Sequence, residues 1–171
     1  KLIERFPKEA LTGVEVEPTL SWLRENRKGY NWLSRYEVDG QFDLVICADV
    51  IEHIPDPDDL LDFIASLNPK VVVLSTPERS LLKRGHNGPP GNPHHFREWT
   101  MDEFARYLSE RATILRHEVC NVEDATQVVV LDGMSNAPNR PYQPYNSDKA
   151  DRIRRVQELA QKRLEAIRSR G

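Results

Sequence analysis

Short apolar runs alternate with amphipathic stretches along most of the chain. Runs rich in β-branched residues, bounded by turn-forming residues, predict strands over residues 11–17, 30–36, 42–50, 70–76, 112–119 and 126–134. Apolar residues at helical spacing predict helices over residues 19–28, 56–67 and 101–110. Thr100 and Glu103 form a capping-box pattern at the start of the third helix.

The alternation of strand and helix indicates an α/β fold. Strands 42–50 and 70–76 are apolar at nearly every position, which is typical of parallel strands covered by helices on both faces. Strand 42–50 is therefore predicted to be a central strand. The last two strands are separated only by a turn, so we expect an antiparallel pair. The predicted fold is a Rossmann-like, mostly parallel sheet with this pair near its end.

The chain changes character after residue 134. Residues 1–134 are predicted to form one domain, and residues 135–147 form a linker rich in proline and asparagine. Residues 148–171 predict an amphipathic helix with an apolar stripe of Ile153, Val156, Ala160, Leu164 and Ile167. This helix could form a homodimer or bind a partner. The alternative is that it packs on its own domain.

Composition excludes several classes of function. Of 171 residues, 39% are hydrophobic and 30% charged, and the net charge of −3 gives no electrostatic case for binding nucleic acid. The apolar runs are too short to span a membrane. The first ten residues contain no apolar core of a signal peptide, so a cytoplasmic location is expected.

Polar residues gather after the carboxyl ends of two predicted strands. Asp49, Glu52 and His53 follow strand 42–50, and Glu15 lies at the end of strand 11–17. Ligands of such folds bind at this rim of the sheet. A carboxylate at the end of a strand commonly accepts hydrogen bonds from the hydroxyls of a nucleoside ribose, which suggests this role for Glu15.

Three segments resemble class I S-adenosylmethionine-dependent methyltransferases. The segment "TGVEVEPTLSWLRE" resembles their second strand and helix, and "FDLVICADVIEHIPDPDDLL" is similar to their fourth-strand motif. The segment "GPPGNPHHFREWTMDEFARYL" resembles the substrate-side loop and helix of the ubiquinone/menaquinone-type and polysaccharide-cluster branches. The likeness extends from Leu11 to about Val130. The family's first strand and glycine-rich loop would precede Leu2.

The resemblance implies a cofactor, S-adenosylmethionine, whose product is S-adenosylhomocysteine. It implies that Glu15 binds the ribose and that Val16 lies beside the adenine. The methionine portion of the cofactor would meet Ala48, Asp49 and Val50. For Asp49, the alternative is a carboxylate that caps local backbone groups.

The resemblance places His53 and Glu52 opposite the methyl acceptor, a small molecule. A histidine with a pKa near neutrality can remove a proton from an attacking hydroxyl or amine. The alternative is a structural Glu52–His53 pair that fixes the turn.

The long loop over residues 77–99 contains three of the eight glycines and four of the twelve prolines. Such loops are frequently binding loops. His94, Arg97 and Trp99 are predicted to shape the floor of an acceptor site, with Arg97 suited to a carboxylate or phosphate. Alternatively, Arg97 and Trp99 anchor the loop to the following helix. His86, His94, His95 and Glu98 lack the spacing of a zinc site, and adjacent histidines usually point apart, so no metal is expected.

The leading hypothesis is methyl transfer to oxygen or nitrogen of a small molecule, with a sugar or glycan intermediate as a candidate. A non-catalytic Rossmann-like binding domain is a second hypothesis, favoured if the chain holds no glycine-rich loop. A nicotinamide-dependent oxidoreductase is a third, because such enzymes share the acid at the end of a strand.

Overall fold

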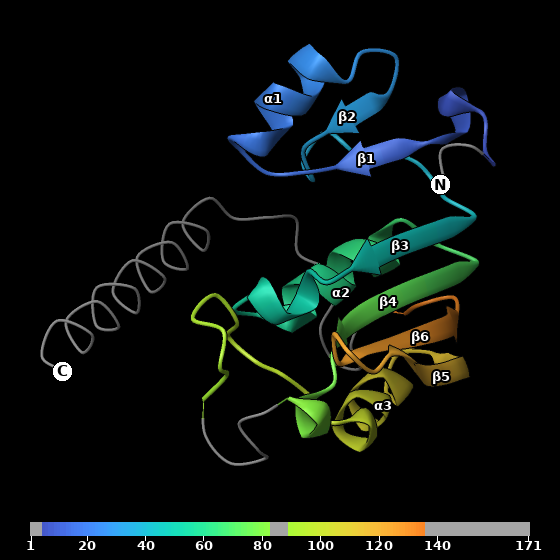
Figure 1. Ribbon diagram of the computed structural model, residues 1–171. Coiled ribbons are helices and arrows are strands. Elements are labelled where there is room, and N and C mark those ends of the chain that lie inside the picture. The colour runs from blue at the N-terminus through green and yellow to red at the C-terminus, as the bar shows by residue number, and fades with distance from the viewer. Residues whose placement is uncertain (1–4, 83–88, 136–171) are drawn as a thin grey trace, which may run out of the picture. The chain divides into compact units, whose positions relative to one another are not determined.

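The computed structural model describes residues 5–82 and 89–135. The chain divides into two compact units, Lys1–Gly40 and Gln41–Gly171, and each is described by itself (Figure 1). The predicted C-terminal helix, and the linker from residue 136 onward, lie outside the described residues.

The N-terminal unit is a strand–helix–strand motif. Its strands, β1 (Thr12–Val14) and β2 (Asn31–Leu33), pair in parallel, and α1 (Thr19–Asn26) connects them. A 3₁₀ helix, Lys8–Ala10, precedes β1. A Cβ atom at Gly13 would collide with the indole of its partner Trp32, so this pairing requires glycine at position 13. The predicted strands and helix are confirmed, although each is shorter than predicted.

The C-terminal unit contains a four-stranded mixed sheet. Its strands follow the order β3 (Leu44–Ala48), β4 (Val71–Pro77), β6 (Thr126–Asp132) and β5 (Thr113–Asn121), as Figure 1 shows. β3 and β4 are parallel, whereas β6 is antiparallel to both β4 and β5. The predicted Rossmann-like α/β fold and its antiparallel pair are confirmed.

Among the described residues of this unit, two α-helices and two 3₁₀ helices accompany the sheet. α2 (Pro57–Ser66) begins with proline, and α3 (Met101–Ser109) begins with the predicted capping box between Thr100 and Glu103. The 3₁₀ helices are Ile51–His53 and Arg79–Leu81. Within residues 5–82 and 89–135, no helix is both long and apolar enough to cross a membrane.

The apolar core lies between the helices and β4 and β6. Its fully buried side chains include Ile51, Leu61, Ile64, Val72, Leu74, Phe104, Leu108, Val129 and Leu131. Among the described residues of this unit, β3 pairs with β4 alone, and Leu44 and Ile46 are exposed, so the predicted central position of strand 42–50 stays a prediction. An apolar run indicates a strand, but it does not distinguish an edge position from a central one.

Hydrogen bonds join the two ends of the loop that follows β4. Glu78 and Trp99 form an isolated parallel bridge, and the Arg79 amide donates to the Trp99 carbonyl over 3.0 Å. The buried side chain of Gln127 donates through Nε2 to the carbonyls of Pro77 and Trp99, at 3.2 and 2.9 Å. The loop therefore leaves and re-enters the core at nearly the same place.

Candidate functional site

The first site residue after β3 is Asp49, which adopts a left-handed backbone conformation with φ of 52°. Its amide donates to the Ser75 carbonyl, and the Ser75 hydroxyl donates to Asp49 Oδ1 over 2.9 Å. Positive φ is uncommon for residues other than glycine, although aspartate tolerates it better than most. Ser75 of β4 thus holds the turn that leads into the Ile51–His53 helix, with Ala48 and Val50 exposed on either side of Asp49.

Glu52 lies in the 3₁₀ helix with only 1% of its surface exposed. Thr76 Oγ1 donates a 3.0 Å hydrogen bond to Glu52 Oε2, and the Phe96 amide donates to the Glu52 carbonyl over 2.8 Å. Burial raises the pKa of the Glu52 carboxyl because it penalises the ionised form, although the Thr76 hydrogen bond opposes this effect. Glu52 is therefore a buried carboxyl group held by two neighbouring segments.

His53 is oriented by the loop that follows β4. Its Nδ1 lies 3.0 Å from the carbonyl oxygen of His94, and its Nε2 lies 4.0 Å from Glu52 Oε1. A carbonyl oxygen can only accept a hydrogen bond, so Nδ1 carries the proton and Nε2 of the neutral ring holds a lone pair. The His53 side chain is 41% exposed, so part of the ring is accessible to a ligand.

His95 contacts His53 edge to face, with ring centroids 4.7 Å apart. Its Nδ1 lies 2.7 Å from Oε1 of Glu98, and its Nε2 lies 3.0 Å from Nδ2 of Asn92. Both His95 and Glu98 have nearly buried side chains, with 9% and 6% exposed. The loop therefore builds a second ordered histidine beside the predicted pair.

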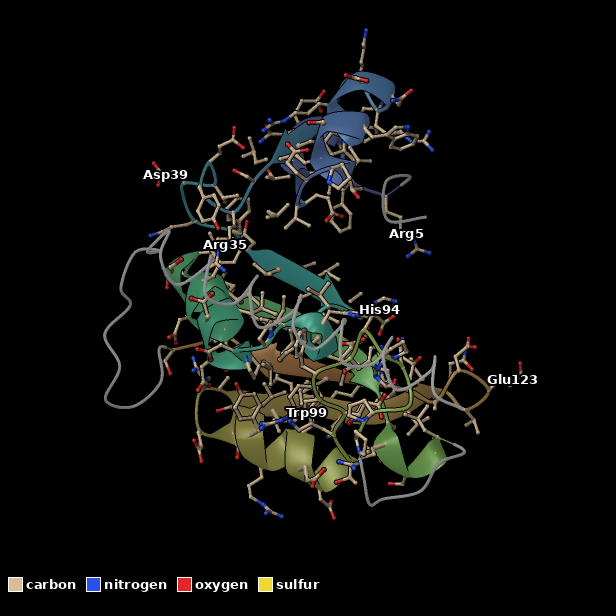
Figure 2. The ribbon with its side chains drawn as sticks, turned by 90° about the vertical axis from the view of Figure 1, so that its left-hand side faces the viewer. Arg5, Arg35, Asp39, His94, Trp99 and Glu123 are labelled. Atoms are coloured by element: carbon tan, nitrogen blue, oxygen red, sulfur yellow. The ribbon has the colours of Figure 1, made fainter. Side chains whose placement is uncertain are left out.

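The three predicted acceptor-binding residues of the loop occupy different environments. His94 is exposed and contributes its carbonyl to His53, whereas Trp99 is buried beside α3 (Figure 2). The Trp99 ring stacks on Tyr107 at 6.2 Å, and the Arg97 guanidinium lies 5.8 Å from the Trp99 ring centre. Trp99 thus packs on α3, and its predicted part in an acceptor site stays a prediction.

Two cavities flank this segment of the loop. One, of about 500 Å³, is lined by polar residues that include Asn92, His95 and Glu98, together with apolar residues of the loop and Asp124. The other, of about 400 Å³, is lined by Arg97, Trp99 and residues of α3. The larger volume lies within the range of pockets that bind small molecules.

The N-terminal unit carries the other predicted cofactor residues. Glu15 follows β1, and its amide donates to the Leu33 carbonyl over 3.0 Å. Its Oε1 accepts a 2.9 Å hydrogen bond from the amide of Val16, which is 68% exposed. Glu15 is partly exposed, so its carboxylate can reach a ligand.

Sequence reasoning identified His53, Glu52 and His94 but missed Thr76, which binds Glu52, and Ser75, which binds Asp49. Thr76 and Ser75 lie near the end of an apolar strand, and nothing in the pattern distinguishes them from other polar residues at the ends of strands. The sequence analysis considered His95 and Glu98 together only as possible metal ligands, and the structure pairs them in a segment without helical periodicity.

Known proteins share this sequence pattern and fold. Residues 7–131 match the family model described as "Methyltransferase domain". No curated protein matches the chain significantly. A candidate type 11 methyltransferase from Sulfolobus solfataricus has a similar structure, with a TM-score of 0.55, 15% identity, and coverage of 85% of this chain and 80% of that one.

Two further structures are named for Hen1. The methyltransferase domain of bacterial CtHen1-C has a TM-score of 0.51 and 22% identity, and the match covers 71% of this chain and 75% of that one. A chain of the Pnkp1/Rnl/Hen1 RNA repair complex has a TM-score of 0.48 and 23% identity. That match covers 71% of this chain but only 31% of the repair-complex chain.

The family match covers most of the candidate site residues in the N-terminal unit and in the C-terminal unit. It includes β1 with Glu15, the segment from β3 to the Ile51–His53 helix, and the whole loop up to Trp99. The structural similarity to the Sulfolobus solfataricus protein independently supports the same fold. The chain therefore belongs to the methyltransferase-domain family of class I S-adenosylmethionine-dependent methyltransferases.

Proposed function

We propose that this protein transfers a methyl group from S-adenosylmethionine to an oxygen or nitrogen atom of a small molecule. The observation that carries the proposal is the match of residues 7–131 to the methyltransferase domain family. The oxidoreductase hypothesis gains no support from this match. His53 adds a chemical reason, because it follows the carboxyl end of β3 and its Nδ1 is bound by the His94 carbonyl, which leaves the lone pair on Nε2.

Residues of each unit fit the cofactor. In the N-terminal unit, the partly exposed carboxylate of Glu15 suits the two ribose hydroxyls, and the exposed Val16 offers an apolar surface to adenine. In the C-terminal unit, the small side chain of Ala48 lets a ligand approach the end of β3, beside Asp49 and Val50. When bound, S-adenosylmethionine supplies an electrophilic methyl group on sulfonium.

His53 and Glu52 are proposed to act on the acceptor. The His94 carbonyl fixes the His53 ring with its proton on Nδ1, so Nε2 can accept a proton from an attacking hydroxyl or amine. Glu52, 4.0 Å away from Nε2, stabilises the imidazolium that forms. Positioning of the acceptor also contributes, because methyl transfer to a good nucleophile needs little help from a base.

The loop is proposed to select the acceptor. Asn92, Glu98 and Asp124 line the cavity of about 500 Å³ with hydrogen-bonding groups. Such groups suit a hydroxyl-rich acceptor, which supports a sugar or glycan intermediate. The exposed Arg97 lines the cavity of about 400 Å³ and is proposed to bind a carboxylate or phosphate of an acceptor, which His94 would contact from the same loop. A homodimer through the C-terminal helix and a cytoplasmic location remain predictions.

Calorimetric titration of the full protein with S-adenosylhomocysteine and with NAD tests the proposal. We expect saturable binding of S-adenosylhomocysteine at one site and no binding of NAD. Binding of NAD alone would contradict methyl transfer and favour the oxidoreductase hypothesis. Binding of neither ligand would favour a non-catalytic domain. Incubating the protein with labelled S-adenosylmethionine and a panel of sugars, amines and phenols would then identify the acceptor class.

A further inference from the structure

Glu52, His53 and His95 bring three potential metal ligands together in the C-terminal unit. One ligand atom from each residue can be chosen so that all three atoms lie within 4.8 Å of one another. Glu52 and His53 belong to the 3₁₀ helix after β3, whereas His95 belongs to the loop after β4. The set of two imidazoles and one carboxylate is one that zinc and other divalent transition ions use in enzymes.

The hydrogen bonds of His53 prepare one of its nitrogens for a metal. Nδ1 donates to the carbonyl oxygen of His94, so the lone pair lies on Nε2, the nitrogen that faces Glu52. Histidines that bind metals almost always donate their other ring N–H to a carbonyl or a carboxylate. His53 therefore has the outer hydrogen bond that a metal ligand requires.

His95 shows the same arrangement with a carboxylate. Glu98 Oε1 lies 2.7 Å from Nδ1 of His95, and both side chains are nearly buried. Asn92 Oδ1 accepts a hydrogen bond from the His94 amide, so its Nδ2 is the donor to Nε2 of His95. His95 thus carries its proton on Nδ1 and a lone pair on Nε2. This lone pair accepts a hydrogen bond from the side-chain amide of the exposed Asn92.

Glu52 offers one carboxylate oxygen to the same space. Thr76 binds Oε2, which leaves Oε1 directed toward Nε2 of His53 at 4.0 Å. This separation is too long for a hydrogen bond. Ligand atoms bonded to one ion at about 2.1 Å lie roughly 3 to 3.5 Å apart, so the longest separation in the cluster, at most 4.8 Å, needs to shorten by at most about 2 Å.

We propose that Glu52, His53 and His95 bind a divalent first-row transition ion through Oε1 and the two Nε2 atoms. Three protein ligands leave positions open for water or an oxygen of a ligand. This proposal revises the expectation of no metal. His94 contributes its backbone carbonyl, whereas His95 contributes its ring, which contacts the ring of His53. The ion takes the His53 lone pair, so His53 is a ligand in the loaded protein and a base only without the ion.

The test is a titration of the full protein after treatment with a chelator. Calorimetry with Zn²⁺, and absorption spectroscopy with Co²⁺, should both give one ion per chain. Mg²⁺, which prefers oxygen ligands, should bind at least about 100-fold more weakly. His95→Ala should weaken Zn²⁺ binding by about 100-fold or more. The matched control is His94→Ala, which removes the adjacent imidazole but keeps the carbonyl, and its affinity should equal that of the wild type.

A second variant tests the assigned nitrogen. Asn92→Asp removes the NH₂ group that competes for Nε2 of His95 and keeps an oxygen that accepts from the His94 amide, so it should bind Zn²⁺ at least as tightly as the wild type. Circular dichroism would verify that each variant is folded. The proposal is overturned if the wild type binds neither Zn²⁺ nor Co²⁺, or if His95→Ala binds as well as the wild type. Marked loss of binding in Asn92→Asp would overturn the assignment of Nε2.

The metal proposal does not depend on methyl transfer, and the two can fail separately. The metal-stripped protein is titrated with S-adenosylhomocysteine, and the metal-loaded protein is titrated in parallel. Ion binding without S-adenosylhomocysteine binding would keep the metal site and contradict the proposed function. Binding of S-adenosylhomocysteine without binding of an ion would support the proposed function and exclude the metal site.

Discussion

The two units of the chain bury very different amounts of side chain. In the N-terminal unit, Leu20 is the only buried residue among residues 5–40. In the C-terminal unit, a core of large apolar side chains surrounds seven buried polar or charged residues: Glu52, Ser75, Thr76, Glu78, Glu98, Arg111 and Gln127. Throughout the described part of the chain, every buried side-chain polar atom has a hydrogen-bond partner.

The two units also differ in how they hold the side chains of their candidate site residues. Glu15 accepts a hydrogen bond from the next residue, Val16, so its position depends on local backbone. His53 and Glu52 are held by His94 and Thr76, which are 41 and 24 residues away in sequence. Substitutions at Glu15 should therefore affect binding alone. Substitutions in the C-terminal network should affect stability as well, because long-range contacts exist only in the folded chain.

The largest expected effect is at His53. His53→Ala should lower turnover by about 10²- to 10⁴-fold if Nε2 accepts the proton of the acceptor. The rate of S-adenosylhomocysteine formation, measured with an acceptor that the wild type methylates, reports this loss. His117→Gln on β5 is the control, because His117 binds the core residue Gln127, and its turnover should stay within about twofold of the wild type. Unchanged turnover in His53→Ala would remove His53 from the chemistry.

Arg111 gives the largest expected effect on stability. Its guanidinium is buried and lies 2.6 and 2.8 Å from Asp62 and Asp58. Arg111→Ala should lower the free energy of unfolding by about 3 kcal/mol, because it leaves two carboxylates without a buried partner charge. Arg24→Ala in the N-terminal unit removes an exposed pair with Glu37 and should cost less than about 1 kcal/mol.

Urea denaturation monitored by circular dichroism measures both losses. Equal losses for the two arginine variants would contradict the comparison between the units. A loss for Arg24→Ala as large as that expected for Arg111→Ala would mean that the N-terminal unit is held by polar contacts rather than by burial.

Glu15→Ala should weaken S-adenosylhomocysteine binding by about 1.5–3 kcal/mol, roughly 10- to 150-fold, because it removes charge-assisted hydrogen bonds to the ribose. The free energy of unfolding should change by less than about 0.5 kcal/mol, since Glu15 is partly exposed. Glu25→Ala, on the exposed part of α1, is the matched control, because it also removes one negative charge from the N-terminal unit. An unchanged dissociation constant for Glu15→Ala would exclude this residue from the cofactor site.

The smallest expected effect is at the exposed Arg97. Arg97→Ala should raise the Michaelis constant of an anionic acceptor roughly tenfold and leave S-adenosylhomocysteine affinity unchanged. Steady-state kinetics and calorimetry on the same preparation separate the two readouts. Arg116→Ala, which removes an exposed pair with Glu118 on β5, should change neither. A loss of cofactor affinity in Arg97→Ala would assign the loop to the cofactor instead of the acceptor.

Local signals in the sequence predicted the elements well. The capping box of Thr100 and Glu103 and the first-turn proline of α2 are confirmed, because both depend on residues within one turn. The antiparallel pair of β5 and β6 is also confirmed. The order of the strands was not predictable from the apolar runs, since such a run indicates a strand and not its neighbours in the sheet.

The candidate site was predictable only in part. The position of Glu52 and His53 after β3 follows from the rule that ligands bind at the carboxyl ends of strands. The approach of His95 to His53 depends on the path of the loop through Asn92 and His94, which involves hydrogen bonds without a sequence period. The burial of Trp99 depends on packing against Tyr107 and Phe104, four or more residues further along the chain.

The joined ends of the loop after β4 have a consequence for how this enzyme could diversify. The Glu78–Trp99 bridge and Gln127 close the loop at its base, and His94 and Phe96, near its second end, bind His53 and Glu52. Lengthening a loop with closed ends costs little conformational free energy, about 0.6 kcal/mol for each doubling of its length. Segments from relatives could therefore replace the residues between Leu82 and Gly91, which precede the residues that bind the Glu52–His53 pair. Each exchange would alter the chemistry presented to the acceptor while the sheet, α3 and the Glu52–His53 pair stay in place.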